Sequence, residues 1–123
     1  MKILIIEDED LIRKTLHRSL TSRGHEVESE PDGEKGLICA EQLKPDLILL
    51  DLMMPIKNGF DFMKETKSKC PVVVMTAYSG DHLEKFSSAE FPLVIGLLKK
   101  PFADLQDLLL QIESLYANHL RKV

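Results

Sequence analysis

The sequence lacks the features that would mark a membrane protein, a disulfide-stabilised protein or a nucleic-acid-binding domain. No apolar run approaches the ~20 residues of a membrane span, and the first residues do not form a signal peptide. The two cysteines, Cys39 and Cys70, stand too far apart for a metal or redox motif. Positive charge is in deficit, with 16 Lys and Arg against 20 Asp and Glu, which argues against nucleic-acid binding. We therefore expect a reduced, cytoplasmic protein that binds neither membrane nor nucleic acid.

Linkers, internal repeats and low-complexity tracts are absent as well. The 123 residues, 44% of them apolar, suit one ordinary hydrophobic core. We expect a single domain over residues 1–123, with no output domain in this chain. The sequence leaves open whether the protein acts alone or was cut from a longer one.

Short apolar runs alternate with amphipathic stretches along the whole chain. Buried strands are predicted at residues 2–6, 47–50, 71–76 and 93–98, and a more polar edge strand at 25–29. Five helices are predicted, at residues 10–23, 32–43, 58–67, 80–90 (the weakest signal) and around 105–116. Alternation of this kind predicts an α/β fold with a doubly wound, mostly parallel sheet and helices on both faces.

Polar residues stand where four of the strands end. Glu7 and Asp8 follow the first strand, Asp51 ends the central one, and Thr76 and Lys100 close the last two. Open α/β sheets bind ligands outside the carboxyl ends of their strands. One such residue could be only a helix cap, but four coincidences at one edge favour a functional site.

The residue types at this edge are chemically consistent with one another. Converging carboxylates from Glu7, Asp8 and Asp51 repel at roughly 4 kcal/mol per pair, for ~4 Å and an effective dielectric near 20. Lys100 supplies one positive charge, and Mg²⁺, which takes carboxylate and phosphate oxygens, can supply the rest. Such a site can hold a phosphoryl group, and an aspartate can itself accept one.

These residues also carry a family resemblance. Four motifs stand in the order and spacing of a response-regulator receiver domain. They are Ile-Leu-Ile-Ile-Glu7-Asp8-Glu9, Asp51-Leu-Met-Met-Pro55 with Gly59, Met75-Thr76-Ala77 and Lys100-Pro101-Phe102. The chain resembles this family of two-component signalling over essentially its whole length. The resemblance implies the flavodoxin-like strand order 2-1-3-4-5.

The resemblance also implies a role for each site residue. Asp51 would accept a phosphoryl group from a histidine kinase or a phosphotransfer protein. Asp8, Asp51 and the main-chain carbonyl of Met53 would bind Mg²⁺, and Glu7 would act through a metal-bound water. Lys100 and the Thr76 hydroxyl would bind phosphoryl oxygens, and the Lys100–Pro101 bond would be cis. The protein would then be a regulatory phosphoacceptor and not an enzyme.

The sequence departs from the family where phosphorylation is usually reported to partners. Leu97 stands where the family usually has Tyr or Phe, so we expect the response to run through residues 77–90 instead. A downstream protein target is expected on the face formed by residues 77–98 and the last helix. In receivers the positions two residues after the phosphoacceptor and after the threonine help to set the phosphoryl lifetime. The resemblance places the large residues Met53 and Tyr78 there, so we expect slow loss of the phosphoryl group.

Three alternatives are open on the sequence. The first is a receiver-like interaction module whose phosphorylation is slow or vestigial. A flavodoxin-like electron carrier would share the topology, but the acids at Glu7 and Asp8 would repel its phosphate. An aspartate-nucleophile phosphatase would need a second acid two residues after Asp51, where Met53 stands.

Overall fold

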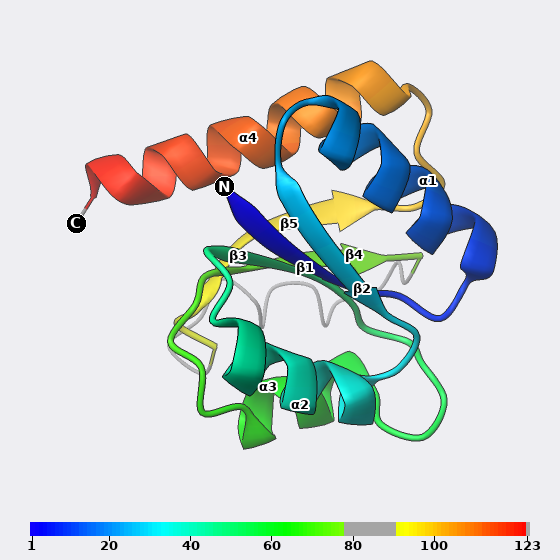
Figure 1. The fold of residues 1–123 in the computed structure, drawn as a ribbon, viewed down its shortest axis with the longest axis vertical. Helices are drawn as coiled ribbons and strands as arrows, with labels where there is room; N and C mark the ends of the chain where they lie inside the picture. Colours follow the sequence, from blue (N-terminus) through cyan, green and yellow to red (C-terminus); the bar gives the residue numbers. More distant parts are fainter. Residues whose placement is uncertain (78–90, 123) are drawn as a thin grey trace.

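The computed structural model describes residues 1–77 and 91–122, and its centre is one five-stranded sheet (Figure 1). All four strand pairings are parallel, and the order β2-β1-β3-β4-β5 confirms the order 2-1-3-4-5. The strands are β1 (Lys2–Ile6), β2 (Glu26–Glu30), β3 (Leu47–Asp51), β4 (Val72–Thr76) and β5 (Val94–Lys99). The polar strand β2 lies at an edge, as its composition predicted.

Helices cover both faces of the sheet (Figure 1). They are α1 (Asp10–Ser22), α2 (Gly33–Leu43), α3 (Gly59–Glu65) and α4 (Leu105–Arg121). Helices α1 and α4 contribute to the hydrophobic cluster on one face, and α2 and α3 to the cluster on the other. Four of the five predicted helices therefore lie among the described residues; the one predicted at 80–90 lies outside them.

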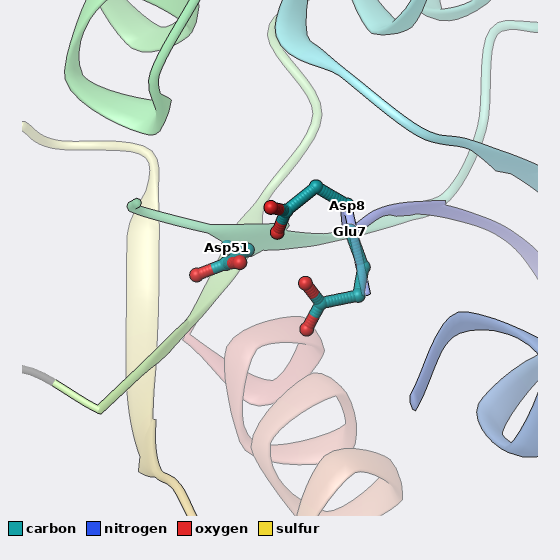
Figure 2. A group of neighbouring side chains, drawn as sticks. All are labelled: Glu7, Asp8 and Asp51. Atoms are coloured by element: carbon teal, nitrogen blue, oxygen red, sulfur yellow. The ribbon is translucent and has the colours of Figure 1, made fainter. Parts of the chain in front are cut away.

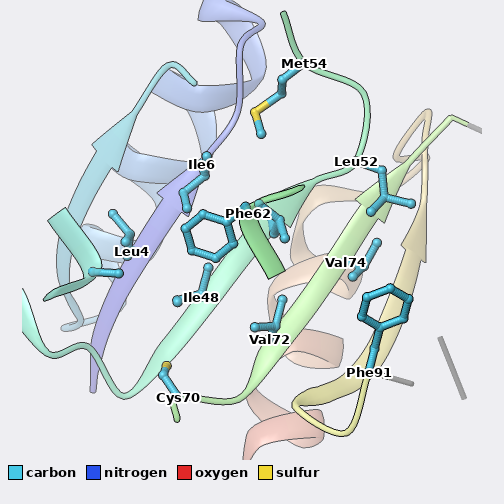
Figure 3. Packing of buried hydrophobic residues seen from close by; sticks show 12 residues of the cluster. Leu4, Ile6, Ile48, Leu52, Met54, Phe62, Cys70, Val72, Val74 and Phe91 are labelled. Carbon is cyan, nitrogen blue, oxygen red and sulfur yellow. The ribbon is translucent and has the colours of Figure 1, made fainter. Parts of the chain in front are cut away.

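The central strands β1, β3 and β4 are apolar except at their ends, because both of their faces are buried. In β1, Ile3 and Ile5 point toward α1 and α4, whereas Leu4 and Ile6 point toward α2 and α3. All four are 0% exposed, and each such side chain contributes about 1.5–3 kcal/mol through its burial. Figure 3 shows the α2–α3 side, where the ring of Phe62 lies beside Ile6 and Ile48.

Three helices begin with a side-chain cap just after a strand. Asp32 caps α2, since its side chain accepts a hydrogen bond from the Lys35 N–H at 2.9 Å. Asn58 caps α3 at 3.0 Å, and Asp104 caps α4 at 3.2 Å. Because each cap satisfies an orphan N–H of the first turn, the caps fix where the loops at the carboxyl edge end. No helix in the ranges 1–77 and 91–122 is long and apolar enough to span a membrane.

Candidate functional site

Three carboxylates meet at the carboxyl edge of the sheet (Figure 2). Glu7 and Asp8 directly follow β1, and Asp51 is the last residue of the neighbouring strand β3. One carboxylate oxygen from each lies within 4.8 Å of the other two. Glu7 is 0% and Asp51 3% exposed, so most of this charge is out of water.

Lys100 provides the ammonium group of the site. Its Nζ contacts the Glu7 carboxylate, lies 3.3 Å from Asp51 Oδ2 and 3.9 Å from a carboxylate oxygen of Glu9. The Lys100 N–H donates to the Thr76 carbonyl at 2.8 Å, so main-chain pairing holds the lysine at the end of β4. The Lys100–Pro101 peptide bond is cis, as the resemblance implied.

The site is short of positive charge. Burial, together with the hydrogen bond to Asp51, raises the pKa of Glu7 to about 8 in spite of the nearby Lys100. Burial also raises the pKa of Asp51, although Glu7 and Lys100 act against it. Burial alone would lower the pKa of Lys100, but its hydrogen bond to Glu7 and the charge of Asp51 raise it. One ammonium group therefore does not balance three carboxylates, and an added cation would be stabilised here.

The loop after β3 packs tightly around Asp51. The Met53 N–H donates to Asp51 Oδ1 at 3.2 Å, and the Gly59 N–H donates to the Leu52 carbonyl at 2.9 Å. A Cβ atom at Gly59 would lie 2.7 Å from the Asp51 carbonyl oxygen, which no real side chain could occupy. The structure therefore explains the Gly59 of the motif as a close approach of two main-chain segments.

The remaining predicted residues lie next to this cluster. Thr76 ends β4 and is 0% exposed, one position after Met75, which pairs with Asp51. The Met53 side chain is 60% exposed, and its main-chain N–H contacts Asp51. Metal binding by the Met53 carbonyl stays a prediction. Tyr78 lies outside the described residues.

Arg13 of α1 is a site residue that the sequence reasoning missed. Its guanidinium donates to the main-chain carbonyls of Glu7, at 2.9 Å, and Asp8, at 3.4 Å, and it pairs with Asp10. The side chain is only 14% exposed, so it holds the acidic loop after β1 in place. A cation one helical turn after an acidic run was the available signal.

The predicted output face is described only in part. Leu97 is partly buried and packs against the cluster on the α2–α3 side of the sheet, which also contains Phe91. Residues 78–90, through which the response was expected to run, lie outside the described part of the chain. That expectation therefore stays a prediction.

Known proteins match both the sequence and the fold. The chain is 40% identical over 116 residues to the transcriptional regulatory protein PdtaR of Mycobacterium tuberculosis; the match covers 91% of this chain and 55% of PdtaR. The chain thus spans about half the length of this curated relative. The Vibrio cholerae chemotaxis protein CheY4 has the same fold, with 28% identity, a TM-score of 0.80, and coverage of 93% of this chain and 97% of the other.

A third match was solved with Mg²⁺, the ion that the carboxylate site suggests. The Thermotoga maritima response regulator TrrA, solved in complex with Mg²⁺ and BeF, gives a TM-score of 0.75 and 26% identity over 93% of this chain and 97% of that one. The sequence model of the response regulator receiver domain matches residues 3–113. The chain belongs to the response regulator receiver domain family of two-component systems.

Proposed function

We propose that Asp51 accepts a phosphoryl group from a phosphohistidine on a histidine kinase or phosphotransfer protein, in a Mg²⁺-dependent reaction. The observation that carries the proposal is the position of Asp51, 3.3 Å from Lys100 within a cluster of three carboxylates at the edge where receivers act. The domain then works as a regulatory switch and has no substrate of its own to turn over.

The reaction needs a carboxylate oxygen that is held still. An Asp51 oxygen attacks the phosphorus atom, the bond from phosphorus to the donor's imidazole nitrogen breaks, and the freed imidazole keeps the electron pair. The hydrogen bond from the Met53 N–H to Oδ1 fixes the orientation of the carboxylate. Lys100, already at the other oxygen, can follow the transferred group and pair with its oxygens.

The donor set at the site suits Mg²⁺. Three carboxylates within 4.8 Å are hard oxygen ligands, and burial raises the pKa of two of them, so a divalent cation relieves a real excess of negative charge. Asp8, Asp51 and the Met53 carbonyl would hold the ion, with Glu7 acting through a water. The bound ion would supply positive charge to the phosphoryl oxygens. Thr76, at the end of β4, would offer its hydroxyl to one of them.

The surroundings of the site favour a protein as the donor. Leu11 is 79% and Ile56 78% exposed, and Met53 is 60% exposed, so large apolar side chains are exposed on the segments that follow β1 and β3. Ile56 also has a φ of 69°, which is strained for a β-branched residue. A cavity of about 280 Å³ beside Lys100 is lined by Leu11 and Phe102, among others. An apolar rim of this kind suits docking of a partner helix.

The downstream partner remains a separate proposal. The face made by residues 77–98 and α4 would contact a protein target, and its described part includes Leu97. Leu110 and Leu120 of α4 are each 54% exposed, which supports an interaction on that helix.

Intact-mass spectrometry tests the phosphoacceptor. With acetyl phosphate and Mg²⁺, the protein should gain one phosphoryl group that is lost in base, and Asp51→Asn should gain none. Asp61→Asn, an exposed acid at the start of α3, is the matched control and should be labelled like the parent protein. Equal labelling of Asp51→Asn would refute the assignment, and no labelling of the parent by acetyl phosphate or a phosphohistidine donor would favour the vestigial interaction module.

A further inference from the structure

A groove lies between the edge strand β2 and helix α2, apart from the carboxylate site. Its volume is about 470 Å³. The lining residues are Glu28 and Glu30 from β2, and Lys35, Ile38, Cys39, Gln42 and Leu43 from α2. None of the residues assigned above to phosphoryl transfer lines it.

One wall of the groove is a sheet edge with unused main-chain groups. Within residues 1–77 and 91–122, strand β2 pairs with β1 alone. The Glu26 N–H donates to the Met1 carbonyl at 3.0 Å, and the Glu30 carbonyl accepts from the Glu7 N–H at 3.1 Å. Because alternate residues of a strand point to opposite neighbours, Val27 and Ser29 direct their N–H and C=O groups away from β1. An extended chain can hydrogen-bond to that edge.

The side chains on this edge are acidic where the adjacent strand is apolar. Glu28 lies opposite Leu4 and Glu30 opposite Ile6 in the parallel register. Neither glutamate forms an ion pair within 4.0 Å with any residue that the structure describes. Lys35 is the single cation among the lining residues. The groove therefore presents two unneutralised negative charges on its strand side.

The two glutamates also act on a thiol in the floor of the groove. Burial raises the pKa of the Cys39 thiol, and the charges of Glu30 and Glu28 raise it further. The floor itself is apolar: Ile38 is 56% exposed, and Cys39 and Leu43 are half-buried beside it. A ligand would thus find an apolar strip next to a row of acids.

We propose that this groove binds an extended, basic segment of a partner protein, which adds to β2 as a strand. Lysine or arginine side chains of the segment lie on the α2 face of the sheet, where their charged ends pair with Glu28 and Glu30 and their aliphatic stems cover Ile38 and Leu43. A second copy of β2 fits poorly, since its own glutamates would face these, and like charges on paired strands are destabilising.

Protection of the edge against aggregation explains only part of these observations. Charged residues on an edge strand commonly serve that purpose. Protection alone does not require a groove, nor a large apolar side chain left more than half exposed in its floor. The combination of charge, open edge and apolar floor points to a partner of complementary chemistry.

The test uses ¹⁵N-labelled protein in saturating Mg²⁺, which competes for the carboxylates of the phosphorylation site. The probe is a capped eight-residue peptide of alternating valine and lysine, with glutamate in place of lysine in the control peptide. The lysine peptide should shift the amide resonances of Val27 and Ser29, and the glutamate peptide should not. Asp51→Asn should give the same result, because this proposal does not depend on phosphorylation.

Two variants and a control locate the binding site. Glu28→Lys combined with Glu30→Lys should weaken peptide binding at least about tenfold, and Ile38→Ser, at an exposed position, should weaken it without disturbing the fold. Glu41→Lys makes the same kind of charge change on the exposed side of α2 and should bind as the parent does. Equal weakening by Glu41→Lys, shifts confined to the loop of Glu7 and Asp8, or no binding by the parent would each overturn the proposal.

Discussion

Two charged clusters at different places in the molecule shift the pKa values of their carboxyl groups in opposite directions. At the carboxyl edge, the buried acids Glu7 and Asp51 have raised pKa values and share one lysine. In the second cluster, Glu113 of α4 accepts from Arg23 Nε at 2.9 Å and pairs with His25 at 2.8 Å. Arg23 and His25 lower the pKa of Glu113 to about 2.

The difference separates a structural cluster from a functional one. The Glu113 cluster joins α4 to the turn between α1 and β2, and each of its charges has a partner. The cluster around Asp51 holds more negative charge than its lysine balances, which costs stability in the metal-free protein. An excess of one charge that the fold retains is typical of a site built for a ligand. Substitutions in the two clusters should separate them, with the largest effect expected at Lys100.

Lys100→Met should have the largest effect. Removing the Lys100 ammonium group leaves Glu7 and Asp51 buried without the lysine that pairs with them both, which should lower the free energy of unfolding by about 3–5 kcal/mol. The loss should shrink as pH falls through about 8, because Glu7 becomes protonated there and no longer needs the ammonium group. Urea unfolding in EDTA measures both. Lys99→Met removes the exposed neighbouring lysine and should change the free energy of unfolding by less than about 0.5 kcal/mol; equal losses would show that the site lysine is misassigned.

Asp51→Asn should act in the opposite direction. Without Mg²⁺ it removes one of the crowded carboxylates, and we expect about 1–2 kcal/mol of added stability. Saturating Mg²⁺ should reverse the order, because only the parent protein gains strong stabilisation from binding the ion. Thermal unfolding with and without Mg²⁺ shows the reversal. A variant less stable than the parent in EDTA would contradict the picture of an overcharged site.

The carboxylates of the site should differ in how strongly they hold the ion. Under the proposed assignment, Asp8→Ala would remove a direct ligand, whereas Glu7→Gln would remove a group that acts through water. We expect Asp8→Ala to weaken Mg²⁺ binding about tenfold more than Glu7→Gln does. Magnesium titration followed by NMR ranks the two variants. The reverse ranking would assign direct contact to Glu7.

Glu113→Gln should have the smallest effect and the clearest pH signature. The Glu113 side chain is 26% exposed, so the pair contributes at most about 1 kcal/mol. Its folded pKa lies below the unfolded value, so its contribution is present above about pH 4.5 and is lost as pH falls through about 2. Glu7 has the opposite sign: its raised pKa makes metal-free stability fall as pH rises from about 4.5 to 8. Urea unfolding gives the free energy of unfolding of the parent minus that of each variant as a function of pH. This difference should rise with pH for Glu113→Gln and fall with pH for Glu7→Gln.

The same contrast explains what the sequence could predict. The meeting of Glu7, Asp8, Asp51 and Lys100 follows from where apolar runs stop, because parallel strands bring their ends to one edge. The order of the strands was available only through the family resemblance. The Glu113 cluster was not predictable, since it joins side chains about 90 positions apart with no motif. The role of Arg13 was not predicted for another reason. Its partners at the site include main-chain carbonyls, which every residue has and which therefore give no sequence signal.

The pairing of β1 with both β2 and β3 constrains how the chain assembles during synthesis. Residues 2–30 can form a β1–α1–β2 unit first, in which α1 covers Ile3 and Ile5. Leu4 and Ile6 must wait for β3, α2 and α3, which at about 5–20 residues per second takes a few seconds. During that interval one apolar face of β1 is uncovered. Nascent chains that stall between residues 30 and 60 should therefore be the ones most readily captured by chaperones that recognise apolar segments.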